Sequence, residues 1–212
     1  EGKPLYTFYM AKYAGVDPET GKALYWKDVL KDVVDENGNP VLDEYGNKKT
    51  YVAGKETTES SSDATQYLCG TALPWAYGGF GTRFSYKGFD LSLDFTYQLG
   101  GQIYDSDYAS MMSMATGGSA IHADLLNAWT PENKNSNIPH IVYADQDVNY
   151  TSDRFLTDAS YLSLQNLNFG YTLPSKFTAK AGISKLRLYL TATNLWVWSK
   201  RQGLDPRQSI TG

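Results

Sequence analysis

The amino-acid sequence predicts an all-β fold. The predicted fold is part of a large antiparallel transmembrane β-barrel that has long extracellular loops and is incomplete in this chain. Three observations lead to this prediction. Apolar and polar residues alternate without a break over 89–99. The connections between the expected strands are short and long in turn. Aromatic residues gather near both ends of those strands.

The segment FDLSLDFTYQL has two faces of opposite character. Its apolar positions are Phe89, Leu91, Leu93, Phe95, Tyr97 and Leu99. Its polar positions are Asp90, Ser92, Asp94, Thr96 and Gln98. Because successive side chains of a strand point to opposite faces, this strand separates an apolar medium from a wet one. The apolar medium is either a protein core or lipid.

The preceding segment predicts the partner strand of a hairpin. A strand is expected over 78–86, and the two residues Lys87 and Gly88 form the turn into the strand over 89–100. In this register the apolar faces of the two strands coincide.

Two further strands are expected in the last third of the chain, over 159–173 and 184–198. In the first, Leu162 and Leu164 have the opposite parity to Leu167, so we expect a bulge or a change of environment near Gln165 and Asn166. In the second, one face carries Leu186, Leu188, Leu190, Ala192, Asn194, Trp196 and Trp198. Opposite that face lie mainly charged and hydroxyl residues.

The N-terminal part predicts shorter strands, over 4–13 and 22–27. Long outer loops are expected over 28–76 and 101–157, the second containing a short helix over 120–129. With the short turn at 87–88 on one side, the long loops all fall on the other side. Outer-membrane barrels show this asymmetry.

Two similar acidic pieces lie in the first expected loop, DENGN at 35–39 and DEYGN at 43–47. Clustered carboxylate and amide oxygens suit Ca²⁺, so a calcium site is one interpretation. The pieces lack the order of acidic residues and the final Glu of an EF-hand loop. Asn-Gly beside Asp is typical of tight turns, because these residues adopt positive φ. Two turns are therefore the favoured interpretation.

Aromatic residues support the membrane interpretation, with interface positions expected at Tyr86, Tyr171, Trp196 and Trp198. Such residues gather at the two surfaces of a bilayer. No stretch of the sequence is apolar enough for a transmembrane helix, but a barrel strand needs only about 9 to 11 alternating residues. The lipid-facing side chains would be Phe89, Leu91, Leu93, Phe95, Tyr97, Leu186, Leu188 and Leu190.

Composition excludes several functions. The formal net charge is −4 and the basic residues are dispersed, so there is no basic stripe for nucleic acid. The single Cys69 forms no internal disulfide. His122 and His140 lie in an irregular region without a nucleophile motif, and one Cys with two distant His do not make a metal site. We expect no enzyme activity and no cofactor.

Four residues of the second long loop are the candidates for contact with a substrate or partner: Tyr104, Asp105, Asp107 and Trp129. Aromatic rings stack on sugars and carboxylates bond to hydroxyl groups, while exposed loops on a rigid scaffold carry binding function. The same residues also suit packing within the loop.

Four segments occur in an order that resembles a known family: AGVDPETGKALYW, YGGFGTRFSYKGFDLSLDFTYQLGGQIYD, SDRFLTDASYLSLQNLNFGYTLP and LRLYLTATNLWVWSK, followed by GLDP. They are similar to the C-terminal part of SusC/RagA-type TonB-linked (TonB-dependent) outer-membrane proteins of Bacteroidetes. The weakest likeness is over 28–66 and 106–150.

The resemblance implies a barrel of about 22 strands that imports oligosaccharides or peptides, driven by TonB. It also implies a SusD-like surface lipoprotein as a lid, the lipid bilayer as surroundings and the outer membrane as location. The plug domain and the TonB-binding segment would lie upstream of residue 1. The alternative from a different class is a soluble, surface-exposed β-sandwich that binds carbohydrate. Exposure of the apolar face over 89–99 distinguishes the two.

Overall fold

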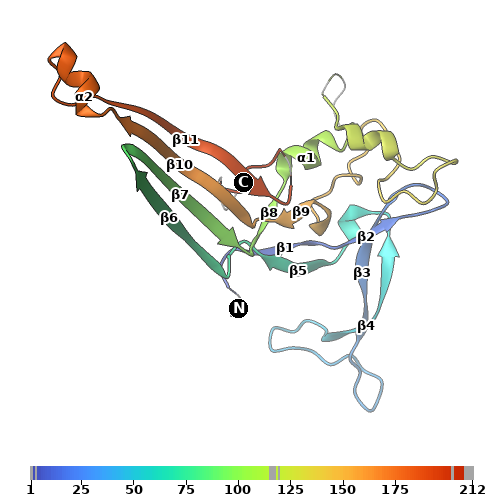
Figure 1. Ribbon diagram of the computed structural model, residues 1–212. Helices are drawn as coiled ribbons and strands as arrows, with labels where there is room; N and C mark the ends of the chain where they lie inside the picture. The colour runs from blue at the N-terminus through green and yellow to red at the C-terminus, as the bar shows by residue number, and fades with distance from the viewer. Residues whose placement is uncertain (1, 3, 115–117, 119, 202, 208–212) are drawn as a thin grey trace. The chain divides into compact units, whose positions relative to one another are not determined.

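The computed structural model describes residues 2, 4–114, 118, 120–201 and 203–207 (Figure 1). The chain divides into two compact units, which are described separately. The first unit consists of residues 1–6, 71–104 and 157–212, and the second of residues 7–70 and 105–156. Among the described residues, no helix has the length and apolar character needed to cross a membrane.

The first unit is built on a four-stranded antiparallel sheet with the strand order β11-β10-β7-β6 (Figure 1). The strands are β6 (Ala76–Tyr86), β7 (Phe89–Leu99), β10 (Tyr161–Thr172) and β11 (Arg187–Ser199). The register places Phe84 opposite Leu91, and Leu91 opposite Phe169. Apolar residues of all four strands therefore share one face, as the alternation predicts.

This apolar face is exposed. Its most exposed large side chains include Phe84 at 61%, Tyr86 at 69% and Leu190 at 63%. In the middle of β7, Leu91, Leu93 and Phe95 are half-buried between the neighbouring strands. Within the described part of the first unit, no second sheet covers it. A soluble β-sandwich would bury these side chains between two sheets, so the structure disagrees with that alternative.

Of the two explanations for the parity change near Gln165, the structure shows the bulge. Between Leu164 and Asn166, the pairing of β10 shifts by one residue relative to β7. On β11, Thr193 pairs with Asn166 and Trp196 pairs with Leu164. Two residues of β11 therefore lie between the partners of Asn166 and Leu164. The one extra residue of β10 keeps Leu164 on the apolar face by compensating for the change of parity, and the two extra residues of β11 leave the parity of Trp196 unchanged.

The two short connections of the sheet lie at the same end. Lys87 and Gly88 turn from β6 into β7 with φ values of 45° and 89°, as expected for a two-residue hairpin turn with both central residues at positive φ. The connection from β10 to β11 contains α2 (Ser175–Thr178) and η4 (Ala179–Ala181). A hydrogen bond of 2.7 Å from Thr172 N to the Gly88 carbonyl joins the two connections.

The second unit contains shorter strands and turns. Its three-stranded antiparallel sheet consists of β2 (Tyr13–Val16), β3 (Ala23–Asp32) and β4 (Thr50–Thr58). A separate ladder pairs β1 (Thr7–Ala11) with β5 (Gln66–Thr71). The described residues of this unit also form four short helical turns: η1 (Ser61–Asp63), α1 (Ser106–Met111), η2 (Ala123–Asn127) and η3 (Asp153–Phe155). The chain also has a ladder of β8 (Gln102–Tyr104) and β9 (Leu156–Asp158).

A small core stabilises the second unit around the fully buried Tyr25 of β3. Ala11 and Ala23 are buried with it, and Tyr13 and Tyr150 pack edge-on against its ring at centroid distances of 5.9 and 6.0 Å. The Tyr25 hydroxyl donates to the Asp147 carbonyl, so the ring's one polar group is satisfied despite its burial.

Several sequence-based boundaries are wrong. The expected loop over 28–76 contains the rest of β3 and all of β4 and β5, and the expected strand over 4–13 is divided between β1 and β2. The sequence of β4 shows no alternation, because nearly all its side chains are exposed and neither face is apolar. The expected helix over 120–129 is the shorter 3₁₀ helix η2.

The expected strand over 184–198 begins at Arg187 in the structure. Leu186 therefore precedes β11, and its carbonyl accepts a hydrogen bond of 2.9 Å from Leu173 N. It lies at the end of the connection, just before the strand that carries Leu188 and Leu190.

The two acidic pieces at 35–47 form turns. The Asp35 carboxylate accepts hydrogen bonds of 2.9 Å from the backbone N–H groups of Asn37 and Asn39. Asp43 does the same with Tyr45 and Asn47, at 2.9 and 2.8 Å. These bonds lower the pKa of both carboxyl groups, chiefly through Asn39 and Asn47. The two carboxylates are thus used to hold the turns.

Candidate functional site

The two faces of the four-stranded sheet are the most distinctive surfaces of the first unit. On the apolar face, rows of residues run across the strands. At the end with the short connections, one row consists of Tyr86, Phe89, Tyr171 and Leu188. Phe89 stacks on Tyr171 with a centroid distance of 4.3 Å. Cross-strand aromatic pairs of this kind stabilise the sheet.

Aromatic residues also mark the other end of the apolar face. Trp196 and Trp198 of β11 are 48% and 58% exposed, and Tyr97 of β7 is half-buried. Tyr97 lies across Gly78 of β6, where a Cβ atom would lie 3.1 Å from its hydroxyl oxygen. Both ends of the strands therefore present exposed aromatic groups beside the apolar middle.

The opposite face is polar and contains an ion pair near the short connections. The Arg187 guanidinium donates to the Asp90 carboxylate through both Nε, at 3.2 Å, and Nη2. Farther along, the Thr191 hydroxyl bonds to the Asn168 amide oxygen at 2.8 Å. At these two places, polar groups of neighbouring strands satisfy one another.

Two glycines make room for the carboxylates of the polar face. A Cβ atom at Gly81 would lie 2.6 Å from an Asp94 oxygen, and one at Gly170 would lie 2.6 Å from Asp90. Glycine within a strand is usually destabilising, so the sequence alone gives no reason for these two residues. The cross-strand register shows that each makes room for a carboxylate.

A pocket of about 530 Å³ lies in the first unit, at the end of the sheet away from the short connections. Its lining includes the polar-face residues Tyr77, Gln98 and Tyr161, together with Ile103 and Arg207. Tyr161 pairs with Gln98 and Ser199, so it belongs to the polar face and not to the apolar row of Leu162 and Trp198.

Arg207 is held at the pocket by several acceptors. Its Nε and Nη2 atoms donate to the Asp205 carboxylate at 2.9 and 2.6 Å, and its Nη1 donates to Ser163 Oγ at 3.0 Å. The hydrogen bonds from Arg207 hold the pKa of Asp205 below its usual range. These bonds hold the positively charged guanidinium of Arg207 beside the pocket. No sequence motif marks this site.

The contacts of Arg207 also show that the expected place of Asn194 on the apolar face is wrong. The Arg207 Nη1 atom bonds to Asn194 Oδ1 at 3.1 Å and to Ser163, a buried residue of the polar face. Asn194 has a φ of 53°, within the bulge of β11. The left-handed backbone lets its side chain reach the polar-face network instead of joining the apolar row expected from its parity.

The four loop candidates are divided between the two units. Tyr104 ends β8 in the first unit, whereas Asp105, Asp107 and Trp129 belong to the second unit. Asp105 is 6% exposed and caps helix α1, accepting a hydrogen bond of 3.0 Å from Tyr108 N. The N-cap position of Asp before a helix is a signal that the sequence does contain. Asp107 is exposed on the first turn of α1.

Trp129 clamps the turn between β2 and β3. Its indole Nε1 donates to the Pro18 carbonyl at 3.2 Å, and its ring meets His140 edge-on at 6.2 Å. The ring lies so close to Gly21 that a Cβ atom there would be 2.3 Å from Trp129 Cε3. The structure therefore assigns part of this side chain to packing.

A smaller, polar pocket of about 390 Å³ lies in the second unit. Lys22 and Glu59 form an ion pair of 2.8 Å in its lining, and Asp145 and Asp147 complete the polar wall. Asp147 accepts from Ser61 N at 2.9 Å, and Asp145 accepts from Asp147 N at 2.9 Å. These carboxylates are engaged in holding the loops together.

Comparisons with known proteins give a consistent result. No protein-family model matches the chain. TonB-dependent receptor P3 of Formosa agariphila is 30% identical over 206 residues, which are 97% of this chain and 19% of that receptor. TonB-dependent receptor SusC of Bacteroides thetaiotaomicron is 26% identical over 180 residues, 84% of this chain and 16% of that receptor.

Among solved structures, the chain is similar to the RagAB peptide transporter, with a TM-score of 0.70 and 32% identity. The match covers 97% of this chain and 21% of that one. The chain thus spans about a fifth of the length of these relatives. The likeness in sequence and in fold supports one conclusion: this chain belongs to the SusC/RagA-type TonB-dependent receptors and forms part of their antiparallel transmembrane β-barrel.

Proposed function

We propose that this chain is part of the wall of a TonB-driven outer-membrane importer of oligosaccharides or peptides. The observation that carries the proposal is the two-faced sheet. Its exposed apolar face meets the condition for contact with lipid, and its polar face meets the condition for a wet lumen.

In this proposal the apolar side chains of β7 and β11 face lipid. They are Phe89, Leu91, Leu93, Phe95, Tyr97, Leu188 and Leu190, with Leu186 at the margin. Tyr86 and Tyr171 lie at one membrane interface, and Trp196 and Trp198 at the other. The pocket beside Arg207 then opens on the lumen near the extracellular side.

The partners proposed are TonB, acting through a region that this chain does not contain, and a SusD-like surface lipoprotein. The loops of the second unit offer the exposed surface for the lipoprotein or for the substrate. Asp107 and the free part of Trp129 remain contact candidates there, and Tyr104 in the first unit. Asp105 has a role in capping that makes it a weaker one.

The substrate class is open to a direct test. RagAB, which shares 32% of its residues with this chain over the match, is described as a peptide transporter. The experiment deletes the gene of the complete receptor in the source organism and measures uptake of labelled oligosaccharides and peptides. We expect the deletion to abolish uptake of one class and the restored gene to return it. Unchanged uptake of both classes would contradict the proposal.

The energy source is tested in the same cells. Collapse of the proton gradient with an uncoupler removes the force that TonB transmits, so we expect uptake to stop while binding at the cell surface persists. Uptake that continues after the gradient has collapsed would exclude a TonB-driven mechanism.

A further inference from the structure

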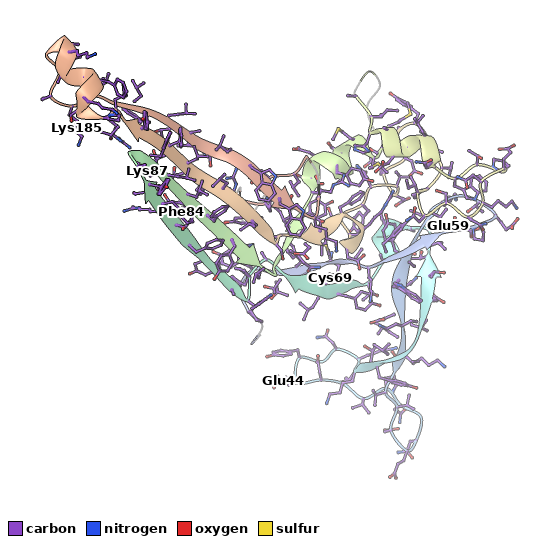
Figure 2. The ribbon with its side chains drawn as sticks, viewed as in Figure 1. Glu44, Glu59, Cys69, Phe84, Lys87 and Lys185 are labelled. Atoms are coloured by element: carbon purple, nitrogen blue, oxygen red, sulfur yellow. The ribbon has the colours of Figure 1, made fainter. Side chains whose placement is uncertain are left out.

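The end of the sheet with the short connections carries a concentration of positive charge. Its four exposed lysines are Lys87 in the β6–β7 turn and Lys176, Lys180 and Lys185 between β10 and β11. We call these four residues the basic rim. Figure 2 labels Lys87 and Lys185, which lie at the same end of the four-stranded sheet.

The fold holds these lysines at one rim. Thr172 N donates to the Gly88 carbonyl at 2.7 Å, and Leu173 N donates to the Leu186 carbonyl at 2.9 Å. The first bond joins the two connections, and the second closes the loop that contains three of the lysines. A Cβ atom at Gly88 would lie 2.6 Å from the Thr172 carbonyl oxygen, which shows how closely the two backbones approach.

Little negative charge balances the basic rim. Residues 171–190 include no Asp or Glu. The nearby Asp90 is engaged by Arg187. Within the described residues, none of the four lysines forms an ion pair with a carboxylate. Their charges are therefore available to an anion outside the chain.

The basic rim continues directly from the apolar face. The row of Tyr86, Phe89, Tyr171 and Leu188 is the last of that face before the connections. Beyond it, the connection exposes two apolar side chains, Phe177 at 60% and Ile183 at 40%. An apolar belt, an aromatic row and then lysines follow the order of hydrocarbon, interface and phosphate in a bilayer.

We propose that the basic rim binds the phosphate groups of anionic phospholipids in the leaflet on the side of the short connections. Phe177 and Ile183 would insert between the lipids, and the lysines would bond to the phosphates around them. The inference assumes the membrane placement of the sheet but not the transported substrate. The site would anchor the depth of this wall and keep a layer of anionic lipid around it.

The test uses the complete receptor, purified in mild detergent and mixed with phosphatidylglycerol or phosphatidylcholine. Native mass spectrometry counts the lipids retained. We expect the wild type to prefer phosphatidylglycerol. The variant with Lys87, Lys176, Lys180 and Lys185 changed to Gln should lose that preference, with affinity falling by about fivefold for each lysine at low salt.

Two controls keep the result interpretable. A matched variant changes four exposed lysines of the second unit to Gln: Lys12, Lys31, Lys49 and Lys55. It should retain phosphatidylglycerol like the wild type. Changing the basic rim to Arg should also preserve retention, because charge is kept.

Equal retention by the Gln variant of the basic rim and the wild type overturns the proposal, as does loss in the Arg variant. A heat-dependent shift in gel migration reports whether each barrel has folded. Because lipid retention is measured without substrate or energy, it is independent of the uptake experiments. A receptor that binds the lipid but imports neither substrate class would contradict only the transport proposal.

Discussion

The two units place their apolar residues in opposite ways. In the second unit, Tyr25 is fully buried among alanines and other tyrosines. In the first unit, Tyr86 and Phe84 are more than 60% exposed on a sheet whose buried and hydrogen-bonded groups lie on the polar side. Burial of apolar side chains suits a unit surrounded by water, whereas in the proposed membrane placement the exposed apolar face suits contact with lipid.

The largest expected effect is in the core of the second unit. Changing Tyr25→Ala removes a buried ring and should lower the local free energy of unfolding by about 3–5 kcal/mol. Hydrogen exchange on the complete receptor should show faster exchange in β3 and its neighbours, while β7 and β10 remain protected. Tyr45→Ala is the control, because Tyr45 is 81% exposed. Equal effects of the two changes would show that Tyr25 does not hold a separate core.

On the four-stranded sheet, a charge should destabilise the exposed apolar face more than the opposite, polar face. Leu93→Arg places a charge at the middle of the apolar face and should cost about 2–4 kcal/mol in a bilayer. Ser92→Arg changes the adjacent residue on the polar face and should cost little. Urea unfolding of the receptor in lipid vesicles measures both. A larger loss for Ser92→Arg would mean that the two faces have been assigned the wrong way round.

The clamp of Trp129 should respond to a single methyl group. Gly21 has a φ of 73°, and its Cβ would collide with the Trp129 ring, so Gly21→Ala should cost roughly 1–3 kcal/mol in the second unit. Tryptophan fluorescence should shift to longer wavelength as the ring gains water contact. Gly54→Ala is the matched control, since nothing lies within 4 Å of its Cβ position. An unshifted spectrum in Gly21→Ala would exclude the clamp.

The smallest effect concerns pH and the turn at 43–47. Hydrogen bonds, chiefly from Asn47 N–H, lower the pKa of Asp43 in the folded state. Their stabilisation is present above the unfolded pKa of about 3.9 and is lost as the pH falls through the lower folded value. The amide resonance of Asn47 should follow that transition in a receptor labelled with ¹⁵N-asparagine. In Asp43→Ala the transition should vanish, and its persistence would point to a different group.

The sequence predicts the wall better than the second unit, and the reason is physical. A strand between lipid and water must alternate, so residues 89–99 reveal both of their faces, and the change of parity around Gln165 reveals the bulge. β4 has water on both sides and leaves no such pattern. The pocket at Arg207 depends on contacts with Ser163 and Asn194, which are distant in the sequence. Asp105, by contrast, has a local capping signal in the sequence, and the structure shows it as the N-cap of α1.

The bulges of β10 and β11 also bear on how this wall tolerates change. Between the same two rows of paired residues, β7 advances by one residue, from Asp94 to Phe95. β10 advances by two and β11 by three. Deletion of Gln165 alone would reverse the parity of residues 161–164 of β10. Ser163 would then lie on the apolar face and Leu162 on the polar face. In related receptors, insertions or deletions of one residue at this height should therefore occur only together with a compensating change in the same or the neighbouring strand. Strand length across this wall would then evolve in coordinated steps.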